Sequence, residues 1–327
     1  MTLTCRSILA PTIGSYLTLK RVLGCQYAME ERVMAHLDRF LVGRHADLTV
    51  ETFADWCLAL QHLASGCRRA RMRVVRNLCL YRRRHEPDCF VPDTRLFPPI
   101  HQAIRPHLFT EGEVVRLLAA ARLKVRTCNA PLGPENVRLA VVLFYTTGLR
   151  RREVTRLTVG DYDARAHTLA IRHSKFHKSR LVAVSAGTAR EIEDLLETRR
   201  RQRFPVGADS ALLWNRTGST GRYSGGGLGL TMRKLFRQAG IRTATGGLPR
   251  THDFRHGFAL TVLLRWYRAG FDVRTKLPLL ATYMGHVSIM STAYYLQFVE
   301  PLAAAASTRF ADACGALITP PVTGGAR

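Results

Sequence analysis

Four short stretches of the sequence carry arginine, lysine, histidine and tyrosine at spacings that suit chemistry on a phosphate ester. In "TTGLRRREV" (residues 146–154), Gly148 permits a tight turn and leaves Arg150 at the start of a helix. A helix N-terminus favours anions, so an arginine there can serve a phosphate. Glu153, one turn later, can fix the geometry of an arginine. For this stretch alone, a solvated arginine is the alternative.

Two further stretches supply candidate acid/base groups. "HSKFHKSR" (173–180) places Lys175 before a hairpin turn and Lys178 just after it, where a lysine can extend from the sheet and donate a proton, or simply be solvated. In "RTHDFRHGFA" (250–259), His252 and Arg255 share one helical face and could pair an acid/base with a clamp. Zinc is disfavoured, because His252 and His256 lack the HExxH glutamate and a third ligand.

The fourth stretch, "GHVSIMSTAYYLQFVE" (285–300), has His286 after Gly285 and then two adjacent tyrosines. At about 100° per residue along a helix that starts near residue 288, Tyr294 falls on a broad apolar face. The other face carries Ser291, Thr292 and Tyr295. The pattern therefore predicts that Tyr294 packs inward and that Tyr295 is presented outward.

The charge balance indicates the partner on which these groups could act. The 327 residues include 49 Lys+Arg against 24 Asp+Glu, a formal net charge of +25. Such a surface repels itself unless it meets a polyanion, and nucleic acid is the commonest one. The alternative is a generally basic protein without such a partner.

One predicted helix concentrates this charge. In "SGCRRARMRVVRNLCLYRRRHEP" (65–87), apolar residues occupy one face and arginines the other, with little interleaved acid. We expect this arginine face to contact the DNA backbone, rather than being merely solvated. The arginines that we expect to bind DNA are Arg68, Arg69, Arg73 and Arg76.

Cysteine spacing and the apolar segments of the sequence indicate the cellular compartment and argue against a metal site. Eight cysteines are scattered without a CxxC pair or zinc-ligand spacing, which is typical of buried thiols in a reducing compartment. The N-terminus lacks a signal peptide's apolar core, and "LAVVLFY" is too short to cross a bilayer. We expect a cytoplasmic, nucleoid-associated protein without metal, cofactor or membrane partner.

Patterning divides the chain into two folded parts. Residues 1–91 are predicted to be helical and to form a DNA-binding domain, residues 92–107 a proline-rich linker, residues 108–310 a second domain and residues 311–327 a tail. Thr110 and Glu113 form a predicted capping box at the start of the second domain. Residues 167–186 predict a hairpin. The glycine-rich "SGGGLGLTMRKLF" matches no phosphate-binding motif and is interpreted as a flexible loop.

Together and in this order, "TGLRRRE", "SKFHKSR", "HDFR" and "GHVSIMSTAYY" resemble the tyrosine recombinase (phage integrase) family, whose motifs are TGxRxxE, a hairpin lysine, HxxR and GH followed by a tyrosine. In that family the nucleophile stands nine residues after the histidine, which gives Tyr295. The resemblance covers roughly residues 105–310. Met284, where leucine is usual, is a small departure. "STAYYL" also resembles recombinases of transposable elements.

The resemblance implies a mainly α fold with a small β-sheet: an N-terminal helical core-binding (SAM-like) domain and an α+β catalytic domain. It implies a site-specific DNA recombinase or integrase that cleaves and rejoins DNA through a 3′-phosphotyrosyl intermediate, independently of metal, in DNA integration or transposition. Alternatives on the same fold are a type IB topoisomerase-like enzyme and a non-cleaving DNA-binding protein. The implied partners are double-stranded DNA, a homotetramer on synapsed sites and sister recombinases.

The resemblance also implies catalytic roles. Tyr295 attacks the phosphate, Arg150 and Arg255 clamp its non-bridging oxygens, and Lys175 is the general acid for the 5′-oxygen. Lys178 takes that role if the hairpin register differs.

The remaining roles are supporting ones. His252 gives acid/base support, and His286 hydrogen-bonds the phosphate or, alternatively, buttresses the helix of the nucleophile. Glu153 orients the arginine site.

Overall fold

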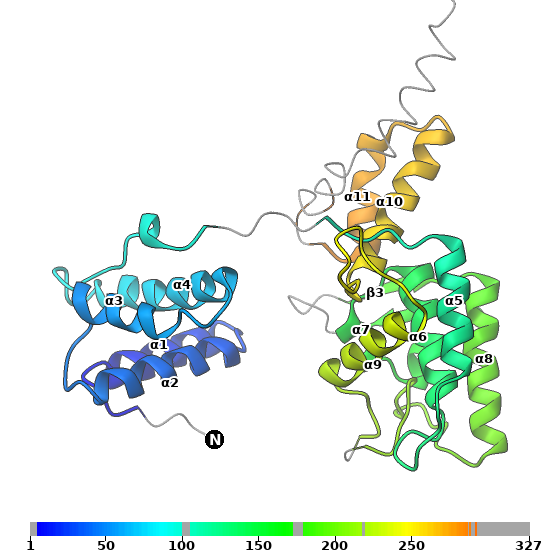
Figure 1. The fold of residues 1–327 in the computed structure, drawn as a ribbon, viewed down its shortest axis with the longest axis horizontal. Helices are drawn as coiled ribbons and strands as arrows, with labels where there is room; N and C mark the ends of the chain where they lie inside the picture. Colours follow the sequence, from blue (N-terminus) through cyan, green and yellow to red (C-terminus); the bar gives the residue numbers. More distant parts are fainter. Residues whose placement is uncertain are drawn as a thin grey trace, which may run out of the picture. The chain divides into compact units, whose positions relative to one another are not determined.

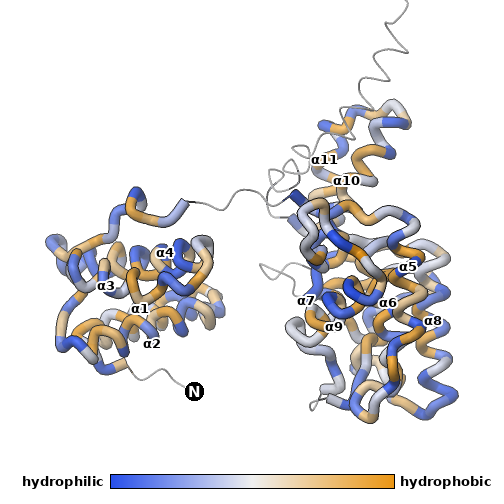
Figure 2. Tube along the Cα trace, viewed as in Figure 1, coloured by the Kyte–Doolittle hydropathy of each residue, from blue (hydrophilic) through white to orange (hydrophobic). Residues whose placement is uncertain are grey.

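The computed structural model describes residues 5–99, 105–172, 179–217, 220–286, 288 and 292, and divides the chain into two units (Figure 1). Unit 1 ends at residue 104 and unit 2 begins at residue 105. Hydrophobic and hydrophilic stretches alternate along the helices of both units (Figure 2), as expected for helices that bury one face. Within the described residues, no helix is both long and apolar enough to span a bilayer.

Unit 1 is a helical bundle with its own core. Its helices are α1 (Ala10–Val22), α2 (Ala28–Val42), α3 (Val50–Ala59), α4 (Ser65–Arg82) and the short 3-10 helix η1 (Thr94–Leu96). The face of α4 predicted to be apolar packs inward, where Met72, Val75 and Leu78 are buried with Trp56. Phe97, inside the segment expected to be a linker, is buried in the same core.

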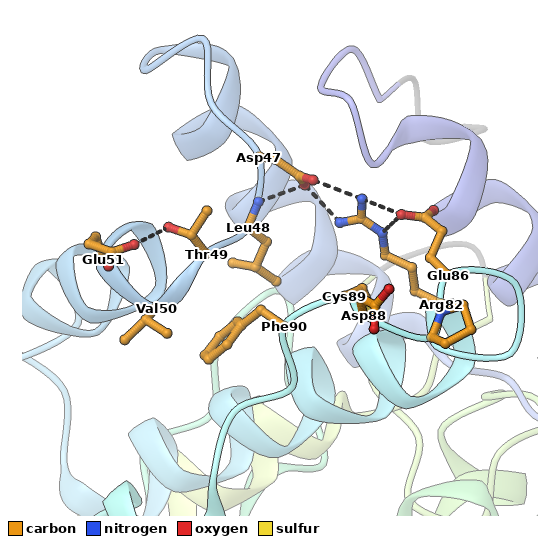
Figure 3. A pocket seen from close by; sticks show the side chains of 11 residues that line it. Asp47, Leu48, Thr49, Val50, Glu51, Arg82, Glu86, Asp88, Cys89 and Phe90 are labelled. Atoms are coloured by element: carbon orange, nitrogen blue, oxygen red, sulfur yellow. Dashed lines mark hydrogen bonds and ion pairs between the residues drawn. The ribbon is translucent and has the colours of Figure 1, made fainter.

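A hollow of about 660 Å³ lies between α4 and the segment that leads into α3 (Figure 3). Arg82 crosses it, donating two hydrogen bonds of 2.7 Å to the Asp47 carboxylate and one of 2.8 Å to Glu86. These bonds from Arg82 hold the pKa of Asp47 below its ordinary value. The ion pairs therefore fix the last turn of α4 against the α2–α3 connection.

Unit 2 is helical with one small sheet. Its helices are α5 (Glu111–Arg122), α6 (Gly133–Thr147), α7 (Arg151–Arg156), η2 (Val159–Asp161), α8 (Ala186–Arg201), α9 (Gly225–Gln238), α10 (Asp253–Arg268) and α11 (Val273–Met284). Its strands are β1 (Tyr162–Asp163), β2 (Thr168–Ile171) and β3 (Arg180–Ala183), which form an antiparallel sheet in that order. The predicted fold class, mainly α with a small β-sheet, is confirmed.

Helix α6 is the centre of unit 2. It contacts α5, α7, α8 and α10, and Leu143 and Phe144 on it are completely buried. The predicted capping box starts α5: the Thr110 hydroxyl accepts from the Glu113 amide (3.2 Å), and the Glu113 carboxylate accepts from the Thr110 amide (2.9 Å). The predicted hairpin is also present, with Leu169 opposite Val182.

Two expectations from the sequence are wrong. The glycine run at residues 225–229 is not a loop but the first turns of α9, begun by the Ser224 hydroxyl, which accepts from the Gly227 amide. A cap and the leucines that α9 buries outweigh the low helix propensity of glycine. The cysteines are not uniformly buried either, since Cys25, Cys67 and Cys128 are exposed.

Candidate functional site

Three arginines from distant parts of unit 2 meet at the carboxyl end of α11. Arg180 Nε donates to the carbonyl oxygen of Tyr283 (2.7 Å), Arg255 Nη2 to that of Met284 (2.6 Å) and Arg150 Nη2 to that of Gly285 (2.9 Å). The last carbonyls of a helix have no partner within it and carry partial negative charge, so they attract guanidinium groups. The predicted clamp residues Arg150 and Arg255 are thus brought together.

A tight turn at Gly148 positions two of these arginines. Gly148 ends α6 with φ +60°, and a Cβ there would lie 2.7 Å from the Phe258 ring, so a side chain does not fit. The turn leaves Arg150 as the N-cap residue of α7. The Gly148 carbonyl accepts from Arg255 Nη1 at 2.8 Å, so the same turn positions both arginines.

Glu153 joins two of the arginines. Its carboxylate is 6% exposed and accepts hydrogen bonds from the Arg150 amide (2.9 Å), Arg150 Nη1 (2.8 Å) and both terminal nitrogens of Arg180 (3.1 and 3.0 Å). Burial alone would raise the pKa of Glu153, but the bonds and charges of Arg180 and Arg150 hold it below its ordinary value. One carboxylate does not balance three guanidinium groups, which leaves the site positive.

Two predicted histidines lie beside these arginines. His252 is the N-cap residue of α10, and its ring meets that of His256 edge-on at 4.8 Å. Partial burial, followed by the charges of Arg255 and Arg250, lowers the pKa of His252 to about 4. Burial, then the charges of Arg255 and Arg150, likewise lowers the pKa of His286 to about 4. Both rings are therefore neutral at neutral pH.

The hydrogen-bond partner of His286 is Thr292, which the helical pattern predicted to lie on the outward face. The Nδ1 of His286 lies 2.7 Å from the Thr292 hydroxyl, and Thr292 is fully buried. The expectation that the face of Ser291, Thr292 and Tyr295 points outward is therefore wrong at Thr292. The error arises because periodicity separates two faces of a helix without telling which one the rest of the domain covers.

Some predicted site residues lie outside the described part of the chain. These are Lys175, Lys178, Ser291, Tyr294 and Tyr295. The strands that flank the hairpin lysines are described: Ile171 at the end of β2 pairs with Arg180 at the start of β3. Because Arg180 belongs to the arginine cluster, β3 begins at the site.

Arg180 is a site residue that motif reasoning missed. It lies two positions before the buried Val182, and side chains alternate along a strand, so both point to the same, inward face. An arginine at an inward strand position needs a buried partner, and that pattern could have identified it. The partner is Glu153.

Of the four arginines of α4 predicted to contact DNA, two donate hydrogen bonds to carbonyl oxygens of the 92–98 segment. Arg69 donates to the Pro98 carbonyl (2.7 Å) and Arg76 to that of Pro92, so both hold the 92–98 segment against α4. Arg68 is partly buried, and its Nε has no hydrogen-bond partner within the described residues. Arg73 is exposed.

No group of three or more His, Cys, Asp or Glu side chains that could hold a metal ion is present within the described residues. The side chains that the site offers to a bound group are instead those of arginines and histidines. Guanidinium groups donate hydrogen bonds in a planar fork that matches phosphate oxygens. The arrangement is suited to an anion rather than a metal.

Comparisons with known proteins agree with this chemistry. Residues 108–300 match the sequence profile of the phage integrase family. A Sinorhizobium fredii protein named as an integrase/recombinase, y4rB, is 33% identical over 87% of this chain and 91% of its own length. A Herpetosiphon aurantiacus protein named tyrosine recombinase XerC is 30% identical over 62% of this chain and 60% of its own. The Tn1549 transposon integrase in complex with transposon right end DNA has a similar fold (TM-score 0.61, 15% identity, 91% and 98% coverage).

Replacing Arg180 with methionine tests the buried ion pair. Arg180→Met leaves the Glu153 carboxylate buried beside fewer positive charges, and we expect the free energy of unfolding to fall by about 3–5 kcal/mol. Above about pH 4.5, the ordinary pKa of Glu153, the loss should be complete; it should shrink as the pH falls and the carboxyl is protonated.

Urea unfolding of both proteins between pH 3.5 and 7 measures this difference. Arg138→Met is the matched control, because Arg138 pairs with Glu191 on partly exposed surface and should cost less than about 1 kcal/mol. Equal losses for the two variants would contradict a special role of the Arg180 pair.

The neutral state of His286 can be measured by NMR titration of its imidazole. We expect a midpoint near pH 4 in the folded protein and near 6.5 in urea. Because the folded pKa is the lower one, the stability that His286 supplies is complete above about pH 6.5 and is lost as the pH falls towards 4. His286→Gln should remove that part of the pH dependence, and a folded midpoint near 6.5 would contradict the assignment.

Proposed function

The chain belongs to the phage integrase family of site-specific DNA recombinases, and we propose that it cleaves and rejoins DNA through the Tyr295 hydroxyl. The phenol passes its proton to a neighbouring base as its oxygen attacks the scissile phosphorus; the bond to the 5′-oxygen breaks, and that oxygen takes a proton from the general acid. A 3′-phosphotyrosyl ester results. Attack by a 5′-hydroxyl on this ester then reverses the step on the same or another strand, and the bond energy is retained.

The observation that carries the proposal is the convergence of Arg150, Arg180 and Arg255 on the last carbonyls of α11, immediately before His286. Negative charge on a phosphate grows in the transition state, and donors already in place stabilise it. Arg150 is 23% exposed and can receive the phosphate directly. Arg255 is 1% exposed, so we expect it to become accessible when DNA binds.

Thr292 favours Tyr295 over Tyr294 as the nucleophile. Thr292 lies against the ring of His286. Residues three apart share a face of a helix, whereas residues two apart do not. We therefore expect Tyr295, three positions after Thr292, on the side of His286, and Tyr294 on the opposite side. This agrees with the count of nine residues from His286, which uses different information.

The other groups take the roles that their positions allow. Lys175 protonates the leaving 5′-oxygen, with Lys178 as the alternative; the strand that follows both lysines in the sequence begins at Arg180, which belongs to the arginine cluster. His252 gives acid/base support and His286 hydrogen-bonds the phosphate; in the absence of DNA, burial and the neighbouring arginines lower the pKa of both rings. Glu153 holds Arg150 in place.

The wider activity follows from the same chemistry. We propose that residues 108–310 form the catalytic domain and residues 1–91 a second DNA-binding domain, in which α4 contacts the backbone through Arg68, Arg69, Arg73 and Arg76. Strand exchange between two sites requires four active subunits, hence a homotetramer on synapsed DNA or one shared with sister recombinases. The likeness to integrase/recombinase proteins favours DNA integration or transposition in the nucleoid over simple relaxation of supercoils.

The nucleophile can be tested with a suicide substrate, a nicked duplex that traps the covalent adduct. Tyr295→Phe should bind DNA as the wild type does but form no adduct, because it lacks the attacking oxygen. Tyr294→Phe is the matched control and should keep trapping DNA. An adduct that survives in Tyr295→Phe and disappears in Tyr294→Phe would show that the wrong tyrosine has been assigned.

A further inference from the structure

A basic hollow of about 430 Å³, which we call the arginine hollow, lies between α7 and the amino end of α9. Four arginines and no acidic residue are among the residues that line it. The residues that matter for its chemistry are Arg151, Arg152, Arg156, Arg222, Thr155 and Gly226. It is distinct from the arginine cluster at the end of α11, because Arg150, Arg180 and Arg255 are not among the residues that line it.

The arginines are held at this place by their surroundings. Arg222 Nη1 donates to the carbonyl oxygen of Arg156 at 3.1 Å, which ties the segment before α9 to the end of α7. The guanidinium of Arg151 lies close to α9, where a Cβ on Gly229 would come within 2.3 Å of its Nη1. Glycine at that position therefore makes room for the arginine. Arg152 is exposed.

The amino end of α9 adds to the positive potential. Helix amino ends carry unpaired N–H groups and partial positive charge. Here the residues of the first turn are Gly225, Gly226 and Gly227, and a Cβ on Gly226 would have nothing within 4 Å. The backbone is therefore open towards the hollow. Charged side chains and helix end together favour an anion with several oxygens.

We propose that the arginine hollow binds a backbone phosphate of the DNA duplex, a few nucleotides from the phosphate that is cleaved. The inference rests on the proposed function, because Arg150, the N-cap residue of α7, belongs to the cleavage site. Arg151 directly follows Arg150, and the six residues of α7 span roughly 9 Å, so the two phosphate sites lie within a short stretch of one duplex. The hollow sets where the duplex lies relative to the nucleophile.

The test places a negative charge in the hollow without disturbing the fold. Gly226→Asp fits sterically, and an acidic residue in the first turn favours the helix, so its melting temperature should equal or exceed that of the wild type. Affinity for a random-sequence duplex should fall about fivefold to tenfold at 0.1 M salt, and the slope of log K against log salt should lose about one unit. Gly226→Asn, of nearly the same size but neutral, should bind DNA within about twofold of the wild type.

Arg152→Gln should reproduce the loss seen with Gly226→Asp. Its control is Arg190→Gln, an exposed arginine on α8, which Figure 1 shows at the far side of unit 2 from α9; this change should leave the slope unaltered. Unchanged affinity and slope in both Gly226→Asp and Arg152→Gln would overturn the proposal. So would calorimetry showing that inorganic phosphate binds the hollow while these variants bind DNA normally.

Each of the two proposals can be rejected without rejecting the other. The hollow is tested by equilibrium binding, whereas the nucleophile is tested by covalent trapping. Loss of the adduct in Tyr295→Phe with a normal salt slope in Gly226→Asp would leave the tyrosine chemistry standing and reject the hollow. If instead Tyr295→Phe still forms the adduct and Gly226→Asp lowers the salt slope, the hollow is retained as a DNA contact and the nucleophile is rejected.

Discussion

The site depends on three successive carbonyl oxygens at the carboxyl end of α11, those of Tyr283, Met284 and the C-cap residue Gly285. Arg150, Arg180 and Arg255 come from α7, β3 and α10, and each donates to one of three successive carbonyls. Like charges brought this close repel one another, so a shared set of acceptors and one buried carboxylate, Glu153, are needed to hold them. The cluster stays positive, and this residual charge is what makes the site complementary to a phosphate.

The hydrophobic core brings these segments to one place. Phe254, between His252 and Arg255 in the sequence, is buried and stacks on Phe109 with ring centroids 3.9 Å apart. Phe144 of the central helix α6 also stacks with Phe254, with ring centroids 6.0 Å apart. Interiors are close-packed, so these rings fix where α10 begins and therefore where Arg255 points. Core packing and the arginine cluster thus share one short stretch of chain.

Local signals in the sequence predicted the local parts of this structure. Thr110 and Gly148 mark helix ends because caps and left-handed turns depend on the residue types themselves. The motif order identified Arg150, His252, Arg255 and His286, which the structure places around one turn. Arg180, the burial of Thr292 and the glycine start of α9 were not predicted, since each depends on tertiary partners that spacing along the chain does not reveal.

The central claim, that guanidinium groups neutralise a phosphate during cleavage, is tested most directly by removing the charge from the DNA instead. Cleavage rates should be compared for a natural scissile phosphate and for a neutral methylphosphonate, with the wild type and with Arg150→Met. On the natural phosphate we expect the variant to be slower by about 10²–10³-fold. On the methylphosphonate the two proteins should differ by less than about tenfold, because no charge needs a partner. Equal slowing of the variant on both substrates would contradict the account.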